Sequence, residues 1–195
     1  IGALTAPALQ RPPAARLAGF AAPAAEVAFD ALLDASPETP VDLRLRAGDG
    51  STLLYTSGTT GAPKGVLFRH GSTGGAAQHF IDLLGVGPDD TLLAVTPLFH
   101  GNAWGAVTTA LTAGATVAFP RAFRASEFWP LVHAVHATVL YTLGTILAIL
   151  LRQEPSPLER DNPLRVILGL GSAPIRDQII ARFGVAGVAE CFGST

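Results

Sequence analysis

The sequence predicts an α/β domain with a mainly parallel sheet and crossover helices that cover the faces of the sheet. From residue 51 onward, short apolar runs typical of strands alternate with segments of helical periodicity, which is the pattern of parallel β–α–β units. A chain of 195 residues is long enough to enclose one core and form one domain. The strand pattern at 165–169 ends in a glycine turn, and Pro174 follows where it can open the next helix.

The individual elements follow from these patterns in chain order. Residues 1–50 are rich in alanine and proline, with a short helix expected near 25–33 and turns at 36–40 and 48–50. Strands are expected at 51–55, 65–69, 91–95, 115–119, 138–142, 165–169 and 187–191. Helices are expected near 72–84, 102–112, 126–136, 144–152 and 175–183. The first two strands are expected to be buried, and prolines 155, 157 and 163 mark a surface loop.

The charge balance argues against several classes of partner. Thirteen basic and 15 acidic residues give a formal charge of −2, so neither nucleic acid nor a membrane surface is an expected partner. Only 14% of the residues are charged, and the mean hydropathy is +0.39. A free-standing domain normally carries more surface charge, so some faces are expected to pack against a missing remainder of the polypeptide. Because the chain begins with Ile1, we expect a fragment.

The sequence shows no evident targeting, membrane or metal-binding pattern. No basic segment precedes an uninterrupted apolar core near the N-terminus, and the longest apolar stretch, residues 139–151, falls short of a bilayer span. The lone Cys191 excludes an internal disulfide. The histidines show no ligand spacing with cysteine or carboxylates, so no metal site is predicted. We expect a cytoplasmic protein with no transmembrane segment.

Two groups of charged residues are interpreted as structural. Asp89 and Asp90 follow Gly87-Pro88, a pattern that indicates a turn and an element cap more than a pair of catalytic carboxylates. Four arginines are scattered along the chain and are expected at the surface: Arg121, Arg124, Arg160 and Arg165.

Residues 56–65 carry the strongest chemical signal. They read Thr-Ser-Gly-Thr-Thr-Gly-Ala-Pro-Lys-Gly and lie between the apolar runs 53–55 and 66–68. The glycines allow backbone conformations that other residues avoid and leave amide N–H groups uncovered. Four hydroxyls and the Lys64 ammonium add further donors. Phosphate oxygens are the natural acceptors for such a set, so we predict a phosphate-binding loop.

Two other interpretations of this loop fit the sequence less well. The Walker nucleotide loop requires glycine-lysine followed by serine or threonine, but here Lys64 follows Pro63 and precedes Gly65. Neither the helix start nor the magnesium-binding hydroxyl of that motif is therefore in place. A flexible Ser/Thr/Gly linker is the second alternative. Its position between two strand patterns, with Pro63 stiffening the exit, favours phosphate binding.

Read as one string, Tyr55–Gly65 resembles the phosphate loop of the AMP-forming adenylating enzymes, which include acyl- and aryl-CoA synthetases, luciferases and adenylation domains of peptide synthetases. The resemblance implies ATP- and Mg²⁺-dependent activation of a carboxylic acid to an acyl-adenylate, usually followed by transfer to coenzyme A. It also implies that Lys64 stabilises charge on the departing pyrophosphate. The implied phosphate-binding positions are Thr56, Ser57, Gly58, Thr59, Thr60, Gly61 and Lys64.

The end of the chain, 189–195, resembles the family's aromatic-Gly-x-Thr-Glu motif up to the position before the glutamate. Phe192 stands where tyrosine is usual; it keeps the π-face that stacks on adenine but lacks the phenolic hydroxyl. Thr195 would contact the phosphate, whereas the place of Cys191 indicates packing and not nucleophilic catalysis. Taken alone, the tetrapeptide at 192–195 is explained equally well as the end of a buried strand. The implied nucleotide-binding positions are Cys191, Phe192, Gly193, Ser194 and Thr195.

A third stretch, residues 165–174, resembles the family's Gly-Gly/Ser-Ala-Pro loop, whose backbone lines the adenine site. Ligands collect at the carboxyl ends of parallel strands, which is where this loop is expected. An ordinary strand-to-helix turn is the alternative. The matching positions are Gly171, Ser172, Ala173 and Pro174.

Residues 96–104 match the segment in which the family builds its acyl pocket. Amino-acid-activating members usually carry an aspartate at the position of His100, to pair with the substrate ammonium. A neutral imidazole supplies no such charge in a buried site, so an uncharged acyl or aryl acid is expected. His100 is interpreted as a wall or gate; a hydrogen-bonded core histidine is the alternative. The implied pocket residues are Phe99, His100, Gly101 and Asn102.

Together these resemblances identify part of the large N-terminal domain of an AMP-forming acyl-CoA synthetase. Residues 1–50 are expected to form an irregular and helical segment of the domain, and residues 51–195 its AMP-binding α/β core. The family's magnesium-binding glutamate, ribose-binding aspartate and catalytic lysine would lie beyond Thr195. No catalytic set is therefore complete, and the isolated fragment is expected to be inactive. A non-catalytic nucleotide-binding or interaction module and an aryl-acid ligase stay open as alternatives.

Overall fold

The computed structural model describes residues 34–35, 44–56 and 64–191. The helix expected near 25–33 and the turn expected at 36–40 lie outside the described residues. The chain from Leu45 onward clusters as one compact unit, and this unit is described below. The assignment of residues 1–50 and 51–195 to two parts of one domain stays a prediction.

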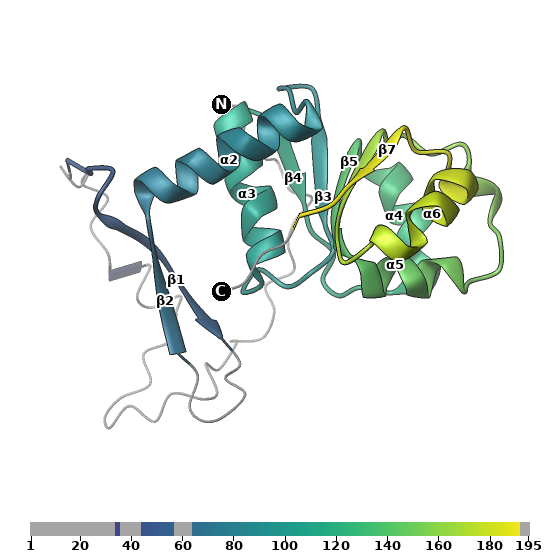
Figure 1. Cartoon of the computed structure of the whole chain (residues 1–195), viewed down its shortest axis with the longest axis horizontal. Coiled ribbons are helices and arrows are strands. Elements are labelled where there is room, and N and C mark those ends of the chain that lie inside the picture. Colours follow the sequence, from purple (N-terminus) through teal and green to yellow (C-terminus); the bar gives the residue numbers. More distant parts are fainter. Residues whose placement is uncertain (1–33, 36–43, 57–63, 192–195) are drawn as a thin grey trace. The chain divides into compact units, whose positions relative to one another are not determined.

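The predicted α/β class is confirmed by a five-stranded parallel sheet (Figure 1). The strand order across the sheet is β4-β3-β5-β6-β7. The strands are β3 (Thr91–Ala94), β4 (Thr116–Ala118), β5 (Val139–Leu143), β6 (Val166–Leu170) and β7 (Gly187–Ala189). In the register of the central strands, Leu140 lies between Leu93 of β3 and Ile167 of β6. Each strand falls within the range that the apolar pattern predicts or extends one residue beyond it.

Helices connect the strands as expected from the periodicity. The longer helices are α2 (His70–Leu84), α3 (Gly101–Ala113), α4 (Phe128–Ala134), α5 (Gly144–Leu151) and α6 (Arg176–Phe183). Short 3₁₀ turns are η1 (Ala125–Glu127), η2 (Pro157–Glu159) and η3 (Ala173–Ile175). Helices α2, α3 and α6 end at Gly85, Gly114 and Gly184, which adopt the left-handed conformation and donate a backbone bond to the preceding turn.

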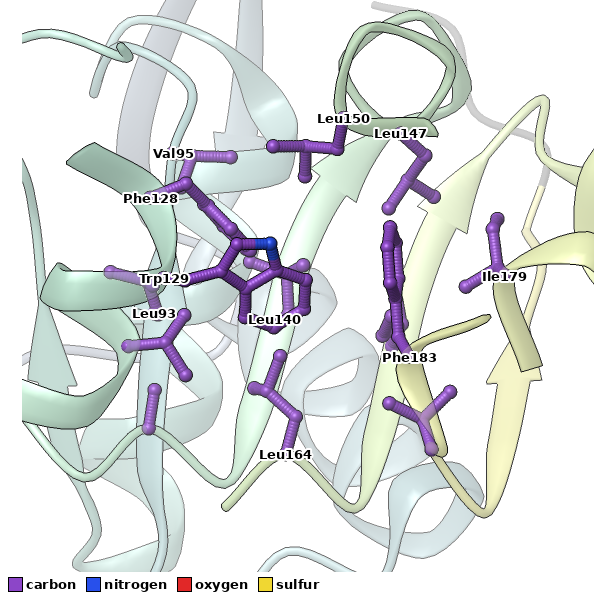
Figure 2. Close-up of a cluster of buried hydrophobic side chains, with 14 of the residues drawn as sticks. Leu93, Val95, Phe128, Trp129, Leu140, Leu147, Leu150, Leu164, Ile179 and Phe183 are labelled. Carbon is purple, nitrogen blue, oxygen red and sulfur yellow. The ribbon is translucent and has the colours of Figure 1, made fainter. Parts of the chain in front are cut away.

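Alternation along the strands produces one hydrophobic cluster on each face of the sheet. Leu92 and Tyr141 face α2 and α3, where the alanines 103, 106 and 110 let α3 pack closely. The opposite cluster joins strand residues such as Leu93 and Leu140 to α4, α5 and α6. Figure 2 shows the side chains of this second cluster pointing toward one another from the sheet and the helices. Trp129 is central, with its ring 4.9 Å from those of Phe128 and Phe183.

The first two strands correct one expectation. Strands β1 (Gly50–Thr56) and β2 (Lys64–Arg69) form a separate antiparallel pair, in which Thr56 lies opposite Lys64. We expected both strands to be buried, and this was wrong: Leu53, Tyr55 and Leu67 are 50%, 59% and 62% exposed, and only Leu54 is buried. In a two-stranded ribbon alternate side chains point to opposite faces. In the described part of the chain, only the face of the ribbon that carries Leu54 is covered.

Two arginine–carboxylate pairs tie distant segments together. Arg165, expected at the surface, instead donates Nε and Nη2 to the Asp90 carboxylate at 3.1 and 2.7 Å, and caps α2 through the carbonyls of Leu84 and Gly85. Asp90 also accepts from the Gly87 amide at 2.8 Å, which confirms its predicted role in a turn. On the other face, Arg182 donates to the buried Glu159 at 2.8 and 2.9 Å.

Candidate functional site

The carboxyl edge of the sheet brings two of the predicted segments to one place. The segment that joins β3 to α3 (residues 95–100) follows β3, and the loop that joins β6 to η3 (Gly171–Ser172) follows β6. Strand β5 lies between β3 and β6. Because all three strands are parallel, their carboxyl ends lie at the same edge. We call residues 96–102 the β3–α3 segment and Gly171–Pro174 the β6–α6 loop.

The strand order also marks this edge as a binding position. After β3 the chain crosses through α3 to β4 on one side, then returns through α4 to β5 on the other side of β3. The connections therefore leave β3 and β5 in opposite directions. In doubly wound α/β folds, ligands bind at such a switch point, outside the carboxyl ends of the two strands. The β3–α3 segment begins directly at this point.

Buried hydrogen bonds fix the β3–α3 segment. The Thr96 hydroxyl donates to Asn102 Oδ1 at 3.2 Å, and Asn102 Nδ2 donates to the Thr142 carbonyl oxygen at 3.3 Å. Thr96 and Asn102 are only 6% and 7% exposed. An amide that uses both its donor and its acceptor inside the protein has a structural task. Asn102, predicted to line the pocket, thus holds the segment against the end of β5.

His100 is the N-cap of α3. Its Nδ1 accepts a bond from the Asn102 backbone amide at 3.1 Å, so Nδ1 carries no proton and a neutral ring carries it on Nε2. This geometry satisfies one of the unpaired amides of the helix start. Phe99, by contrast, is 78% exposed, and Gly101 is also exposed. The predicted pocket residues therefore divide into an anchored pair, His100 and Asn102, and an exposed pair, Phe99 and Gly101.

The β6–α6 loop has a fixed backbone. Gly171 adopts φ +73°, a conformation that favours glycine. Ser172 is fully buried and its hydroxyl donates to the Gly169 carbonyl at 2.8 Å, so that hydroxyl is engaged within the protein. Pro174 is exposed and sits in the first turn of η3, which leads into α6, as its position in the sequence predicts.

The first residue of α5, which directly follows β5, contacts this loop. A Cβ placed on Gly144 would lie 2.6 Å from the Gly171 carbonyl carbon and 3.1 Å from the Ser172 nitrogen, and closer still to the Gly171 oxygen. Glycine at 144 therefore permits a close approach of two backbones. Sequence reasoning did not single out Gly144 or Thr142. An isolated glycine between a strand and a helix pattern was the available signal for Gly144.

The phosphate loop is described only at its ends. Thr56 and Lys64 face each other in the β1–β2 register, and Lys64 is exposed. Residues Ser57, Gly58, Thr59, Thr60 and Gly61 lie outside the described residues, as do Phe192, Gly193, Ser194 and Thr195. Cys191 packs against the α2–α3 cluster, and its burial, followed by the charge of Glu190, raises the pKa of its thiol. A thiol that resists ionisation is suited to packing, as expected.

Two buried polar atoms near this edge have no hydrogen-bond partner within the described residues: Thr142 Oγ1 and Trp104 Nε1. A separate groove of ≈ 440 Å³ is lined by Val95, Pro120–Arg124, Glu127, Phe128 and Leu131, and it contains none of the predicted site positions.

Residues 34–35, 44–56 and 64–191 hold no cluster of histidine, cysteine, aspartate or glutamate that could bind a metal ion. The magnesium ion implied by the resemblance therefore finds no ligand set in this part of the chain. The same described residues include no helix that is long and apolar enough to cross a membrane.

The strand order and the switch point at its carboxyl edge define a doubly wound α/β domain, a class in which nucleotides bind at this edge. Comparison with known proteins specifies the family. The family model described as AMP-binding enzyme matches residues 7–195. The chain belongs to this AMP-binding enzyme family.

Named relatives and structures agree with that assignment. The chain is 38% identical over 154 residues to the medium/long-chain-fatty-acid–CoA ligase FadD6 of Mycobacterium tuberculosis, with 77% of this chain and 26% of the relative covered. It is 39% identical over 152 residues to steroid-22-oyl-CoA synthetase of Rhodococcus jostii, covering 75% of this chain and 27% of the relative.

Among solved structures, O-succinylbenzoate coenzyme A synthetase from Bacillus subtilis in complex with AMP matches with TM-score 0.71 and 27% identity, over 85% of this chain and 34% of that one. The chain thus spans about a quarter of the length of these curated relatives. Both of these curated relatives are named as acid–CoA ligases or synthetases.

Proposed function

We propose that these residues belong to an ATP-dependent acyl-CoA ligase that activates a carboxylic acid as an acyl-adenylate and transfers the acyl group to coenzyme A. One observation carries the proposal. The β3–α3 segment and the β6–α6 loop, which resemble the acyl and adenine segments of the family, lie at one sheet edge with the end of β5 between them. That arrangement suits an acid and a nucleotide that must react with each other.

In this proposal the protein acts by positioning and by charge neutralisation. An oxygen of the substrate carboxylate attacks the α-phosphorus of ATP, the new oxygen–phosphorus bond forms, and the bond to the β-phosphate oxygen breaks to release pyrophosphate. Lys64, at the start of β2, would offset the negative charge that develops on pyrophosphate. The β6–α6 loop would present its backbone to the adenine. Magnesium, general for this family, would neutralise phosphate charge when bound. The coenzyme A thiol would then attack the acyl carbon of the acyl-adenylate, so that the carbon–sulfur bond forms, the bond to the AMP oxygen breaks, and AMP and a proton are released.

The substrate is proposed to be an acid without an amino group. The segment 96–104 contains no aspartate or glutamate, so it offers no partner for a substrate ammonium. The His100 ring, with Nδ1 engaged in the α3 cap, supplies no negative charge either. Relatives named for fatty-acid and steroid-22-oyl substrates favour an apolar acyl group. We propose a cytoplasmic location because both ATP and coenzyme A are available there.

The test measures pyrophosphate release by the full-length protein with ATP and a panel of medium- and long-chain fatty acids, with amino acids as the contrast. Fatty acids are expected to support turnover and amino acids are not. Lys64→Ala is expected to slow release about 10- to 150-fold, from the loss of a charge-assisted contact of about 1.5–3 kcal/mol. Arg152→Ala, which removes an exposed cation from the end of α5, is the matched control.

Two outcomes would contradict the proposal. If no carboxylic acid stimulates pyrophosphate release, the alternative of a non-catalytic nucleotide-binding or interaction module is favoured. If Lys64→Ala and Arg152→Ala release pyrophosphate at the same rate as the unchanged protein, the assignment of Lys64 to the phosphates is wrong.

A further inference from the structure

The β5–α5 junction, which we define as Thr142–Gly144, contacts both of the segments assigned to substrates. Its first residue accepts a bond from the β3–α3 segment, through the Thr142 carbonyl and Asn102 Nδ2. Its last residue meets the β6–α6 loop, through the close approach of Gly144 to Gly171.

The contact with the β3–α3 segment is buried and specific. Asn102 is fixed by its donor to Thr142 and by its acceptor from Thr96, and all three residues are at most 7% exposed. A buried amide whose two ends are both bonded has one low-energy orientation. The path of the backbone from Thr96 to the start of α3 is thereby tied to β5.

The contact with the β6–α6 loop is steric. At Gly144 a Cβ would come 2.6 Å from the Gly171 carbonyl carbon, whereas ordinary contact begins at 3.4 Å. Any side chain at 144 would therefore push the loop away by at least about 0.8 Å, which is the difference between these two distances, and farther at the closer Gly171 oxygen. Ser172, the next residue of the loop, is bonded to Gly169 and cannot follow without breaking that bond.

We propose that Thr142–Gly144 and Asn102 are positioning residues that set the distance between the bound acid and the bound nucleotide. The inference rests on the proposed function, because it assigns the β3–α3 segment to the acid and the β6–α6 loop to the nucleotide. Neither Gly144 nor the Asn102 amide needs to touch a substrate. Each instead fixes one of the two binding segments against the same β5–α5 junction.

The two halves of the proposal predict different kinetic effects. Gly144→Ala displaces the β6–α6 loop, so the KM for ATP is expected to rise 10-fold or more, with a smaller change in the KM for the acid. Asn102→Ala frees the β3–α3 segment, so the KM for the acid is expected to rise 10-fold or more, with a smaller change for ATP. A displacement near 1 Å can cost on the order of 100-fold in rate, so kcat is expected to fall in both variants.

Conservative variants separate positioning from general destabilisation. Thr96→Ser keeps the hydroxyl that donates to Asn102 and is expected to retain the KM for the acid, whereas Thr96→Val removes that donor and is expected to raise it. Asn102→Asp keeps the acceptor for Thr96 but loses the donor to Thr142, so it is expected to resemble Asn102→Ala. Gly75→Ala is the matched steric control, because a Cβ at Gly75 in α2 meets nothing within 4 Å.

The measurements use the full-length protein, with the folded fraction of each variant checked by thermal unfolding. A purely structural role reduces the amount of active protein, and hence kcat, but leaves both KM values unchanged; that result would overturn the inference. Equal increases of both KM values in Gly144→Ala and in Asn102→Ala would overturn it too. Should Gly144→Ala fail to fold, the Thr96 and Asn102 variants test the inference by themselves. Absence of any acid-dependent turnover in the unchanged protein would instead reject the proposed function.

Discussion

The Asp90–Arg165 pair gives the sharpest prediction about the fold. Arg165 and Asp90 are 75 residues apart in sequence, and their charge-assisted bonds join the start of β6 to the turn before β3. Burial alone raises the pKa of the Asp90 carboxyl, but the bonds from Arg165, Thr138 and Gly87 outweigh that effect and lower the pKa to about 2. The folded state therefore favours the ionised carboxylate.

The size of the effect follows from that shift. A fall from 3.8 to about 2 corresponds to roughly 2.4 kcal/mol between the ionised and neutral forms. The Arg165 side chain is 38% exposed, so solvent screening reduces the expected contribution to about 1–2 kcal/mol. Asp90→Asn, which removes the charge but preserves the shape, is expected to lower the free energy of unfolding by about that amount at pH 7.

The assay is urea unfolding of the 195-residue chain from pH 7 to pH 2, with Asp89→Asn as the control on the exposed neighbouring residue. Because the folded pKa is depressed, the contribution of Asp90 is fully present above about pH 5 and is lost as the pH falls toward 2. The difference between the unchanged chain and Asp90→Asn should therefore shrink over that range. A difference that stays constant with pH, or an equal loss in Asp89→Asn, would refute the reasoning.

Further outcomes are expected at three other buried groups. Glu159→Gln should lower the free energy of unfolding by about 1–3 kcal/mol, because it weakens a buried bond to Arg182. Urea denaturation of Asp161→Asn, at an exposed aspartate, supplies the comparison, and equal losses would count against the pair. Thr142→Val should leave the urea unfolding midpoint unchanged or raise it, since the Thr142 hydroxyl has no partner in the described residues. A fall of more than about 1 kcal/mol in the free energy of unfolding would mean that this hydroxyl has a partner. Tyr141 is fully buried and bonds Thr109, and burial raises its pKa to about 12; in a Tyr55→Phe chain, which keeps Tyr141 as the sole tyrosine, absorbance at 295 nm should show little phenolate at pH 11, and full ionisation there would contradict the burial.

Much of the fold could be predicted because each strand and helix leaves a local pattern. The run at 138–142 predicts β5, which the structure places at Val139–Leu143, and the pattern at 102–112 predicts α3 at Gly101–Ala113. Burial on both faces makes parallel strands almost continuously apolar, so their positions are visible in sequence. The helix expected at 126–136 ends earlier, at Ala134, where the backbone turns before His136 adopts a positive φ.

What could not be predicted depends on which segments meet in space. The strand order places β5 beside β3, and no local pattern contains that information. Arg165 looked like a scattered surface residue because its partner Asp90 is 75 positions away. The exposure of Leu53 and Tyr55 depends on whether another element covers the second face of the ribbon, which alternation alone does not determine.

The candidate site, too, could be predicted from the sequence only in part. Motif resemblance located the β3–α3 segment and the β6–α6 loop in the sequence, and strand direction then places both at the carboxyl edge. The contacts between them run through Thr142 and Gly144, which carry no motif of their own. A glycine whose importance lies in a backbone approach from another loop can be recognised only once that loop has been placed.

The central claim is that this sheet edge holds an acid and a nucleotide side by side. Hydrogen–deuterium exchange of the full-length protein, with and without a stable acyl-sulfamoyl-adenosine analogue, tests it most directly. The analogue is expected to slow amide exchange in peptides covering residues 96–102 and 171–174 and to leave residues 150–163, on the α5–η2 side, unchanged. Saturating analogue that protects neither of the first two peptides would contradict the account.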